Sequence, residues 1–345
     1  MATKKLHFLD RFIFFINAVL AFLLLLSYAL PFISPRFLPF FSILNFGIPV
    51  LILLNIIFLL YWVLKLKKQF LLSGIVLILG YSHITSLYVF ADKKNEATDG
   101  FKIMSYNVRH FNLHRWIENV DVVQEIEQFI EQENPDFIAF QDFKADSDFN
   151  IEANYPNHYI YFKGSDKNLT TAFYSKYPII NKKNIAFPNT GNGALFVDVK
   201  LPNDTLRVFN IHLESLKIKP DVKELKNEDR KKLVNRVGQS FKKQAEQVDL
   251  IQPYIENSPY KNIIIGDFNN TAFSFVYRKL KNNNLKDAFK EKGRGFGKTF
   301  DFDFIPIRID HALVDQEIEV IDFNNYEVQL SDHYPIMLEF TLPDN

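Results

Sequence analysis

Three long stretches without a charged residue constrain this chain more than any other feature of its sequence. Arg11 and Arg36 are separated by 24 uncharged residues. Arg36 and Lys65 are separated by 28, and Lys68 and Asp92 by 23. A helix rises about 1.5 Å per residue, so roughly 20 apolar residues cross a hydrocarbon core of about 30 Å. Residues 1–91 are therefore expected to form a transmembrane region of about three helices, at residues 12–30, 40–64 and 70–90.

Two of these spans have alternative interpretations. The first could be a cleaved signal peptide, but its apolar stretch is long and no clear small-x-small cleavage site follows it. The third is diluted by polar and small residues, among them Ser73, Gly80 and His83. It either spans fully, re-enters on the same side, or packs against its neighbours. His83 itself is interpreted as a neutral, hydrogen-bonded helix residue rather than a functional group.

The basic residues that flank the spans predict the orientation. They cluster before the first span and after the second, at Lys4, Lys5, Arg11, Lys65, Lys67 and Lys68. Because cytoplasmic loops carry an excess of Lys and Arg, the N-terminus and the second loop should face the cytoplasm. Three crossings then place the rest of the chain on the other side. The prediction is a multi-pass protein of the cell membrane with an extracytoplasmic C-terminal region.

Most charged residues lie in that C-terminal region. Residues 1–91 hold seven basic and one acidic side chain, which leaves 33 basic and 39 acidic side chains for the following 254 residues. Residues 92–100 lack hydrophobic periodicity and are interpreted as a short linker. Residues 101–345 are long enough for one globular domain with a sizeable core. The absence of cysteine excludes disulfides, thiol catalysis and cysteine-ligated metals.

The C-terminal region alternates between two periodicities. Apolar positions at helical spacing predict helices within residues 117–130 and 225–252, with Pro135 and Pro253 as their stops. Runs rich in β-branched and aromatic residues predict strands at 101–108, 136–143, 171–180, 194–201, 206–213, 262–268 and 308–314. The mixture of hairpins and helical crossovers predicts an α/β domain with paired sheets flanked by helices.

Polar residues follow the apolar strands where the strands end. Singly, each has an ordinary explanation, because Asp and Asn cap helices and form turns. Together they form a set of carboxylates, amides and imidazoles that could meet at one rim of the sheets: Asn107, Asp142, His212, Asp267, Asn269, Asp310, Asp332 and His333. Oxygen ligands of this kind suit Mg²⁺ or Mn²⁺ rather than zinc.

The motifs SYN, FQD, NIHL, GDFN, RID and SDHYP occur in this order along the chain. In this order they resemble the endonuclease/exonuclease/phosphatase superfamily, the DNase I-like proteins, over nearly all of residues 101–345. The resemblance implies a four-layer αββα sandwich and metal-dependent hydrolysis of phosphoesters. Membrane attachment is not part of that resemblance and rests on the apolar spans alone.

Carried over position by position, the resemblance implies roles for the eight polar residues. Asn107, Asp142 and Asp332 resemble the metal ligands, although the family usually has Glu where this chain has Asp142. His212, Asp267 and Asn269 resemble the groups that bind phosphate and orient water. His333, held by Asp310, resembles the catalytic histidine, and the sequence leaves open whether His333 or Asp267 takes the proton.

Two hypotheses of different class follow. The first is a membrane-anchored phosphodiester hydrolase with Mg²⁺ or Mn²⁺, acting on nucleic acid or on a phospholipid or inositol phosphate. The second is a catalytically silent scaffold of the same fold that binds a phosphate ligand or a partner. Retention of the histidines and carboxylates favours the enzyme. The net charge of −6 after residue 91 weakens the case for a nonspecific nuclease, and the sequence identifies no protein partner.

Residues 293–299, GRGFGKT, superficially suggest a phosphate-binding P-loop. Lys292 stands where that motif needs its first glycine, and no clear strand precedes it. The segment is therefore interpreted as a flexible loop on the substrate side, with Arg294 and Lys298 as candidate phosphate contacts.

Overall fold

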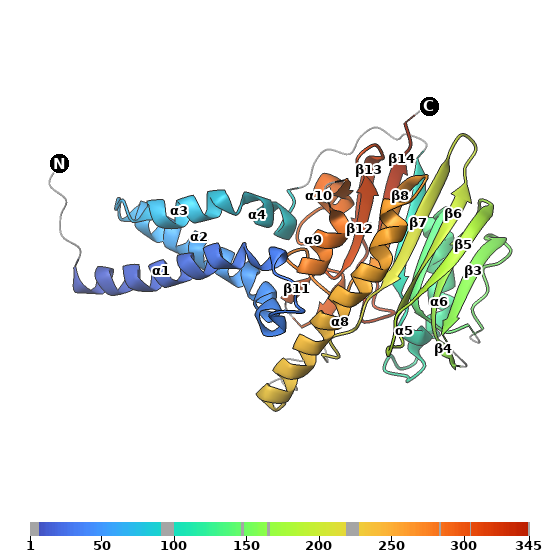
Figure 1. Ribbon diagram of the computed structural model, residues 1–345, viewed down its shortest axis with the longest axis horizontal. Coiled ribbons are helices and arrows are strands. Elements are labelled where there is room, and N and C mark those ends of the chain that lie inside the picture. Colours follow the sequence, from blue (N-terminus) through green and yellow to red (C-terminus); the bar gives the residue numbers. More distant parts are fainter. Residues whose placement is uncertain are drawn as a thin grey trace.

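The computed structural model describes residues 7–90, 100–145, 148–163, 166–218, 228–282, 284–303 and 305–343. Figure 1 shows N-terminal helices that project from one side of two packed sheets. The linker predicted at residues 92–100 falls almost entirely on residues 91–99, which lie outside the described residues.

The N-terminal helices are apolar and largely exposed. By length and composition, two helical stretches could cross a membrane: Phe8–Phe32, which contains α1 (Phe8–Ser27) and η1 (Leu30–Phe32), and Pro39–Leu64, which contains η2 (Pro39–Gly47) and α2 (Ile48–Leu64). The predicted second span therefore begins with a 3₁₀ segment, and its α-helix starts only at Ile48.

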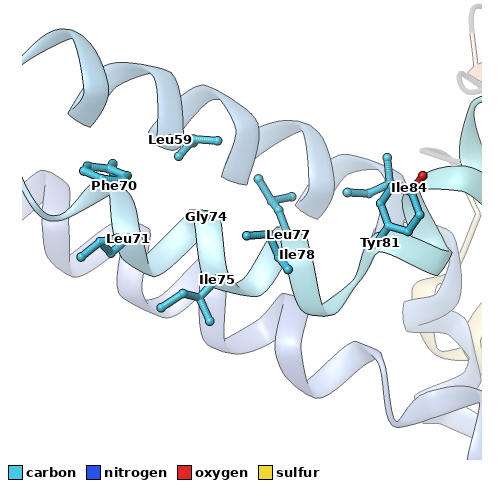
Figure 2. A pocket seen from close by; sticks show the side chains of 9 residues that line it. All are labelled: Leu59, Phe70, Leu71, Gly74, Ile75, Leu77, Ile78, Tyr81 and Ile84. Atoms are coloured by element: carbon cyan, nitrogen blue, oxygen red, sulfur yellow. The ribbon is translucent and has the colours of Figure 1, made fainter.

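The third predicted span, residues 70–90, is not one continuous helix. It consists of α3 (Phe70–Leu79) and α4 (Tyr81–Leu87), which are bent by 72° at the break between them. Gly80 stands at the bend, where an added Cβ would lie 1.9 Å from the Tyr28 hydroxyl. Whether this pair forms one span remains a prediction. Residues of α2, α3 and α4 line an open apolar pocket (Figure 2): Leu59, Phe70, Leu71, Gly74, Ile75, Leu77, Ile78, Tyr81 and Ile84.

A buried polar cluster joins the three N-terminal helices. The Asn17 amide donates to the Ser73 hydroxyl at 2.7 Å, and that hydroxyl donates to the Asn55 side chain at 3.1 Å. The Trp62 indole donates to the Asn17 carbonyl oxygen at 3.0 Å. Because these side chains satisfy one another away from water, they fix the packing of α1, α2 and α3.

The C-terminal region contains two six-stranded mixed sheets. In the first, the strand order is β13 (Glu319–Asn325), β14 (Ile336–Thr341), β1 (Phe101–Asn107), β2 (Phe137–Phe143), β4 (Asp166–Ser175) and β3 (Asn157–Lys163). In the second, the order is β5 (Ile179–Ala186), β6 (Gly193–Lys200), β7 (Thr205–His212), β8 (Lys261–Asp267), β12 (Asp310–Asp315) and β9 (Leu285–Asp287). A separate hairpin joins β10 (Phe300–Phe302) to β11 (Ile305–Ile307).

Three buried apolar clusters show how the layers stack. One lies between the sheets, with Phe137 and Phe173 from the first and Val208 and Ile265 from the second. Another packs the first sheet against α6 (Val122–Glu133). A third packs the second sheet against α8 (Arg230–Glu256) and α9 (Phe275–Lys281). The order helix, sheet, sheet, helix agrees with the predicted α/β fold.

Several predicted boundaries are wrong for local reasons. The run 171–180 belongs to two strands, because Ser175 and Tyr177 form a turn closed by the Ser175 hydroxyl, which donates to the Tyr177 carbonyl at 2.7 Å. Pro253 lies inside α8 rather than ending it. Proline removes one backbone donor, and the helix ends three residues later, so the loss is small.

Candidate active site

The predicted polar residues converge at one edge of the two sheets. The parallel pair β1 and β2 aligns Asn107 with Gln141, and the parallel pair β7 and β8 aligns His212 with Asp267. The antiparallel pair β8 and β12 places Asp310 opposite Asp267. Gly266 has φ +139°, and a Cβ there would lie 2.1 Å from the Ile211 carbonyl oxygen. Glycine before Asp267 therefore allows β7 and β8 to approach closely.

Asp267 lies at the centre of this arrangement. Its side chain is 1% exposed and accepts from the Asn107 amide at 3.1 Å. It also accepts from the backbone N–H and the side-chain amide of Asn269, at 2.7 and 3.0 Å. Burial raises the pKa of the Asp267 carboxyl to about 6, and the nearby charge of Asp310 adds to this effect. Asn107, Asn269 and Asp267 therefore form one hydrogen-bonded unit.

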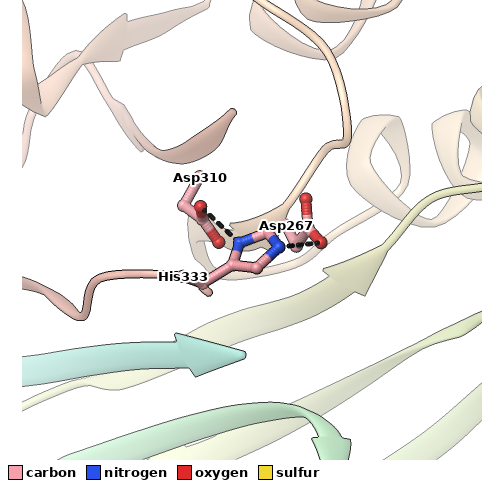
Figure 3. Close-up of side chains that lie close together, drawn as sticks. All are labelled: Asp267, Asp310 and His333. Atoms are coloured by element: carbon pink, nitrogen blue, oxygen red, sulfur yellow. Dashed lines mark hydrogen bonds and ion pairs between the residues drawn. The ribbon is translucent and has the colours of Figure 1, made fainter. Parts of the chain in front are cut away.

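His333 lies between two carboxylates, as Figure 3 shows. Its Nδ1 is 3.0 Å from Asp310 Oδ2, and its Nε2 is 3.7 Å from Asp267 Oδ2. Although burial opposes the charged ring, Asp310 and Asp267 raise the pKa of His333 to about 10. This environment favours an imidazolium that carries protons on both nitrogens.

Asp142 reaches the site through an irregular strand end. The register of β2 against β4 shifts between Phe140 and Phe143, and Asp142 has a left-handed φ of 47°. Bulges of this kind redirect side chains. The Asp142 carboxylate lies 3.5 Å from His212 Nδ1 and 4.0 Å from His110 Nε2. His212 in turn places its Nε2 3.5 Å from Asp267, so Asp142 joins the same network.

Asp332 joins the network through Arg109. The Arg109 guanidinium lies 3.0 Å from the Asp332 carboxylate. The backbone N–H of Arg109 donates to the Asn107 side-chain oxygen at 3.1 Å. The Ser331 hydroxyl donates to the Asn107 carbonyl at 2.8 Å, which ties the segment before β14 to the end of β1. All eight predicted residues therefore lie in one connected set of polar contacts.

Arg109 and the Trp116 ring that covers it were not predicted from the sequence. The guanidinium lies 3.7 Å from the centre of the Trp116 ring. Four consecutive residues, 109–112, have φ values of 43°, 54°, 52° and 59°. Such a left-handed run is costly for residues with a Cβ, and strain of this kind concentrates at functional sites. The one available signal was that Arg109 follows the SYN motif closely.

The two sheets are joined behind the site by buried amides. The Gln141 amide donates to the Asn210 side-chain oxygen at 2.7 Å. The Asn210 amide donates to the Phe140 and Ala172 carbonyls, at 3.0 and 2.9 Å. Gln141 lies in the first sheet and Asn210 in the second, so these bonds fix how the residues of β2 face those of β7.

The two basic residues proposed as phosphate contacts in the 293–299 loop already have acidic neighbours. Arg294 lies 3.5 Å from Asp322, and Lys298 lies 2.8 Å from Asp301. Neither contacts the residues of the network in the structure.

His311, next to Asp310, belongs to a separate buried network. Its Nε2 lies 2.9 Å from the Asn270 carbonyl, to which it donates, and its Nδ1 accepts from Arg308 Nη1 at 3.0 Å. Arg308 is also paired with Asp287 at 3.1 Å. Burial and the Arg308 charge lower the pKa of His311 to about 3. The ring is therefore neutral.

This arrangement predicts a pH-dependent stability. A histidine with a lowered pKa contributes stability that is complete above the unfolded pKa of about 6.5 and is lost as pH falls towards 3. The midpoint of thermal unfolding should therefore fall between pH 6.5 and 4. His311→Gln keeps a donor and an acceptor without a titratable ring, so its midpoint should change less over that range. Equal slopes for the two proteins would contradict the assignment.

The donor set is compatible with a hard cation. Asn107, Asp142 and Asp332 offer one amide and two carboxylates, and oxygen ligands of this type suit Mg²⁺ and Mn²⁺. Among the described residues, a group of three acidic or histidine side chains whose ligand atoms lie within 4.8 Å of one another is Asp267, Asp310 and His333. Because His333 is ion-paired on both sides, this second group is better explained as a proton-holding network.

Two packed sheets with this polar edge define a DNase I-like α/β protein. The model of the Endonuclease/Exonuclease/phosphatase family matches residues 104–333, and the chain belongs to that family. A second family, described as a domain of unknown function (DUF8431), matches residues 10–87. A comparison with curated proteins by sequence finds no match.

Solved structures share the fold at low sequence identity. An endonuclease/exonuclease/phosphatase from Bacteroides vulgatus is 19% identical, with a TM-score of 0.56, and the match covers 71% of this chain and 100% of that one. A Bacteroides thetaiotaomicron mannosyl-6-phosphatase is 17% identical, with a TM-score of 0.54 and coverages of 70% and 100%. D. rerio TDP2 complexed with single-strand DNA product is 15% identical, with a TM-score of 0.52 and coverages of 71% and 100%.

Proposed function

We propose that this protein is a membrane-anchored hydrolase of phosphoesters that works with a divalent cation. The observation that carries the proposal is the single network of eight polar side chains at the edge of both sheets, with Asp267 at its centre. Membership of the family and the names of the neighbours, a mannosyl-6-phosphatase among them, support the reaction class.

In the proposed reaction, water attacks phosphorus in line with the leaving oxygen. The bond between phosphorus and that oxygen breaks, and the leaving oxygen takes up a proton from solvent. Asp267 accepts a proton from that water, because its carboxylate is buried and oriented by Asn107 and Asn269. His333 enters as an imidazolium, because both ring nitrogens face carboxylates. It is thus a donor to the phosphate oxygens, and Asp310 fixes its orientation.

His212 and Asn269 are proposed to donate hydrogen bonds to the phosphate oxygens, on which negative charge builds in the transition state. His212 lies between Asp142 and Asp267, at 3.5 Å from each. The Asn269 amide donates to the Leu213 carbonyl and to Asp267, at 3.0 Å each, so it has to release one of these bonds to donate to phosphate. Donors fixed in this way contribute up to a few kcal/mol each to transition-state stabilisation.

The proposed cation is Mg²⁺ or Mn²⁺, held by Asn107, Asp142 and Asp332. When bound, it would supply positive charge that neutralises the phosphate oxygens. Asp142 is one methylene shorter than the usual Glu and lies at the irregular end of β2, where its carboxylate is 3.5 Å from His212 Nδ1. Arg109, paired with Asp332, adds a further positive charge beside these ligands.

The proposed location is the cell membrane, with several spans and the hydrolase region outside the cytoplasm. The two apolar helical stretches support the membrane location. The orientation further requires that α3 and α4 together form a third span, because two crossings would return the chain to the side of the N-terminus. A green fluorescent reporter fused after Asn345 should stay dark, and alkaline phosphatase at the same position should be active. Bright fluorescence without phosphatase activity would refute the orientation.

The substrate class is proposed only as a phosphodiester or other phosphoester. Full-length protein in detergent should be incubated with Mg²⁺ or Mn²⁺ and DNA, RNA, inositol phosphates or phosphodiester lipids. We expect turnover of at least one substrate, its loss in EDTA, and its recovery when the cation is returned in excess. Turnover that persists in EDTA would remove the cation from the proposal. No turnover on any substrate would favour the phosphate-binding scaffold.

A further inference from the structure

The loop that carries Asn269 extends to the N-terminal helices and packs a side chain into their apolar core. Residues 268–274 join β8 to α9, and Asn269 at the start of this loop binds Asp267. Four residues later, the Phe273 side chain is only 4% exposed. It packs in the apolar core formed by α1, α2 and α3, with Ala21, Leu24, Ile48, Ile52, Val76 and Leu77. One short loop therefore connects the catalytic edge with the helical bundle.

Aromatic rings hold Phe273 in that position. The His83 ring is stacked on Phe273 with centroids 5.8 Å apart and planes 5° apart. The Tyr28 ring packs against the other ring, His83, with centroids 4.6 Å apart. The Tyr28 hydroxyl donates to the Val76 carbonyl at 3.1 Å. His83 of α4 therefore stacks directly on Phe273, and Tyr28, which follows α1, packs against His83 and the same apolar core.

A second contact joins α4 to the same catalytic elements. Arg308 Nη2 donates to the Ser86 carbonyl at 3.3 Å. The same guanidinium contacts His311, which donates to the Asn270 carbonyl. Arg308 lies two residues before Asp310, and Asn270 follows Asn269. The helix α4 is therefore connected to both the Asn269 loop and the start of β12.

A third contact leads to His333. Val89 and Gly295 exchange two backbone hydrogen bonds, at 2.9 and 2.8 Å. The Thr299 hydroxyl, four residues after Gly295, accepts from the backbone N–H groups of Ile309 and Asp310, at 3.0 Å each. Phe300 then pairs with His333 through an isolated β-bridge. Val89, which follows α4, is thus linked through residues 295–300 to Asp310 and His333.

We propose that the N-terminal helices are a working part of the active site, and that Phe273 is the positioning residue through which they hold the Asn269 loop. Phe273 does not reach the reacting atoms and acts through Asn269 and Asp267. Catalytic donors must be held within about 0.5 Å of their productive positions. Gln244 holds the first part of the loop, at the Asn269 carbonyl and the Asn270 side chain. Phe273 holds its far part. The inference rests on the proposed function, because it assigns Asn269 and Asp267 to the reaction.

The test uses full-length protein in lipid nanodiscs and compares Phe273→Ala with Leu24→Ala. Leu24 is buried in the same apolar core but belongs to α1 rather than to the loop, so it is the matched control. Phe273→Ala should lower kcat about 10- to 100-fold with KM within about twofold, as expected for misplaced catalytic groups. Leu24→Ala should lower the unfolding temperature by a similar amount and leave kcat unchanged. Phe273→Leu should recover most of kcat.

Hydrogen exchange of residues 268–274 provides a readout that does not depend on turnover. It should accelerate in Phe273→Ala and stay at the wild-type rate in Leu24→Ala. Equal kcat for the two alanine variants, or unchanged exchange in the loop of Phe273→Ala, would overturn the inference while leaving the proposed reaction intact. A wild-type protein that hydrolyses no phosphoester would instead refute the proposed function.

Discussion

Asp267→Asn should lower kcat by about 10²- to 10⁴-fold, the range usual for loss of a general base. The substitution keeps the shape of the side chain and removes its charge and its basicity. Four polar side chains lie within 3.7 Å of this carboxylate, those of Asn107, Asn269, His212 and His333. Initial rates on the substrate identified with wild-type protein, at saturating cation, provide the measurement.

The matched control for this prediction is Glu317→Gln. It makes the same carboxylate-to-amide change at a side chain that is 73% exposed and faces Lys261. Its kcat should equal that of wild type. Asp267→Asn combined with His333→Asn should be little worse than either single variant, because groups that act as one unit are not additive. An Asp267→Asn protein within tenfold of wild type would remove Asp267 from the role of base.

Arg207→Met should lower the free energy of unfolding by about 3–5 kcal/mol, because it leaves a buried carboxylate without its partner. Arg207 Nε and Nη2 lie 2.6 and 2.8 Å from the two oxygens of Asp198. The two side chains are 8% and 2% exposed. They are direct cross-strand neighbours on β6 and β7, five residues from His212. Denaturant unfolding followed by circular dichroism in detergent would measure the loss.

Two further variants make this result interpretable. Arg294→Met makes the same change at an exposed pair with Asp322 and should cost less than about 1 kcal/mol. Asp198→Asn added to Arg207→Met should recover part of the loss, since it removes the uncompensated charge. If Arg207→Met were as stable as wild type, the Arg207–Asp198 pair would contribute no more to the free energy of unfolding than the packing of a Met side chain does.

The sequence was sufficient to predict the strands that carry the site. Their apolar residues are nearly continuous because both sheets are covered, as in β8, where Ile263, Ile264 and Ile265 are fully buried. Edge strand β5 was not recognised as a separate strand. Its sequence IINKKNIA is mostly exposed and carries two lysines, a pattern that protects an edge from pairing and hides its strand character.

Other parts of the site depend on backbone geometry that composition does not reveal. Arg109 contacts Asp332 because residues 109–112 adopt left-handed φ values, and nothing in RHFN predicts such a run. The apolar composition of residues 39–47 likewise did not distinguish a 3₁₀ segment from the start of a spanning helix. Phe273 shows no periodicity that would place it among helices more than 180 residues earlier in the chain.

The contact at Phe273 also bears on how this chain can be recombined. Two family models divide the sequence, one over residues 10–87 and the other over residues 104–333, as though the halves were independent modules. In the molecule, a residue of the second half completes the apolar interior of the first. A chimera that takes its N-terminal half from another protein would therefore need a pocket for this ring, and its two parents would have to be chosen as a matched pair.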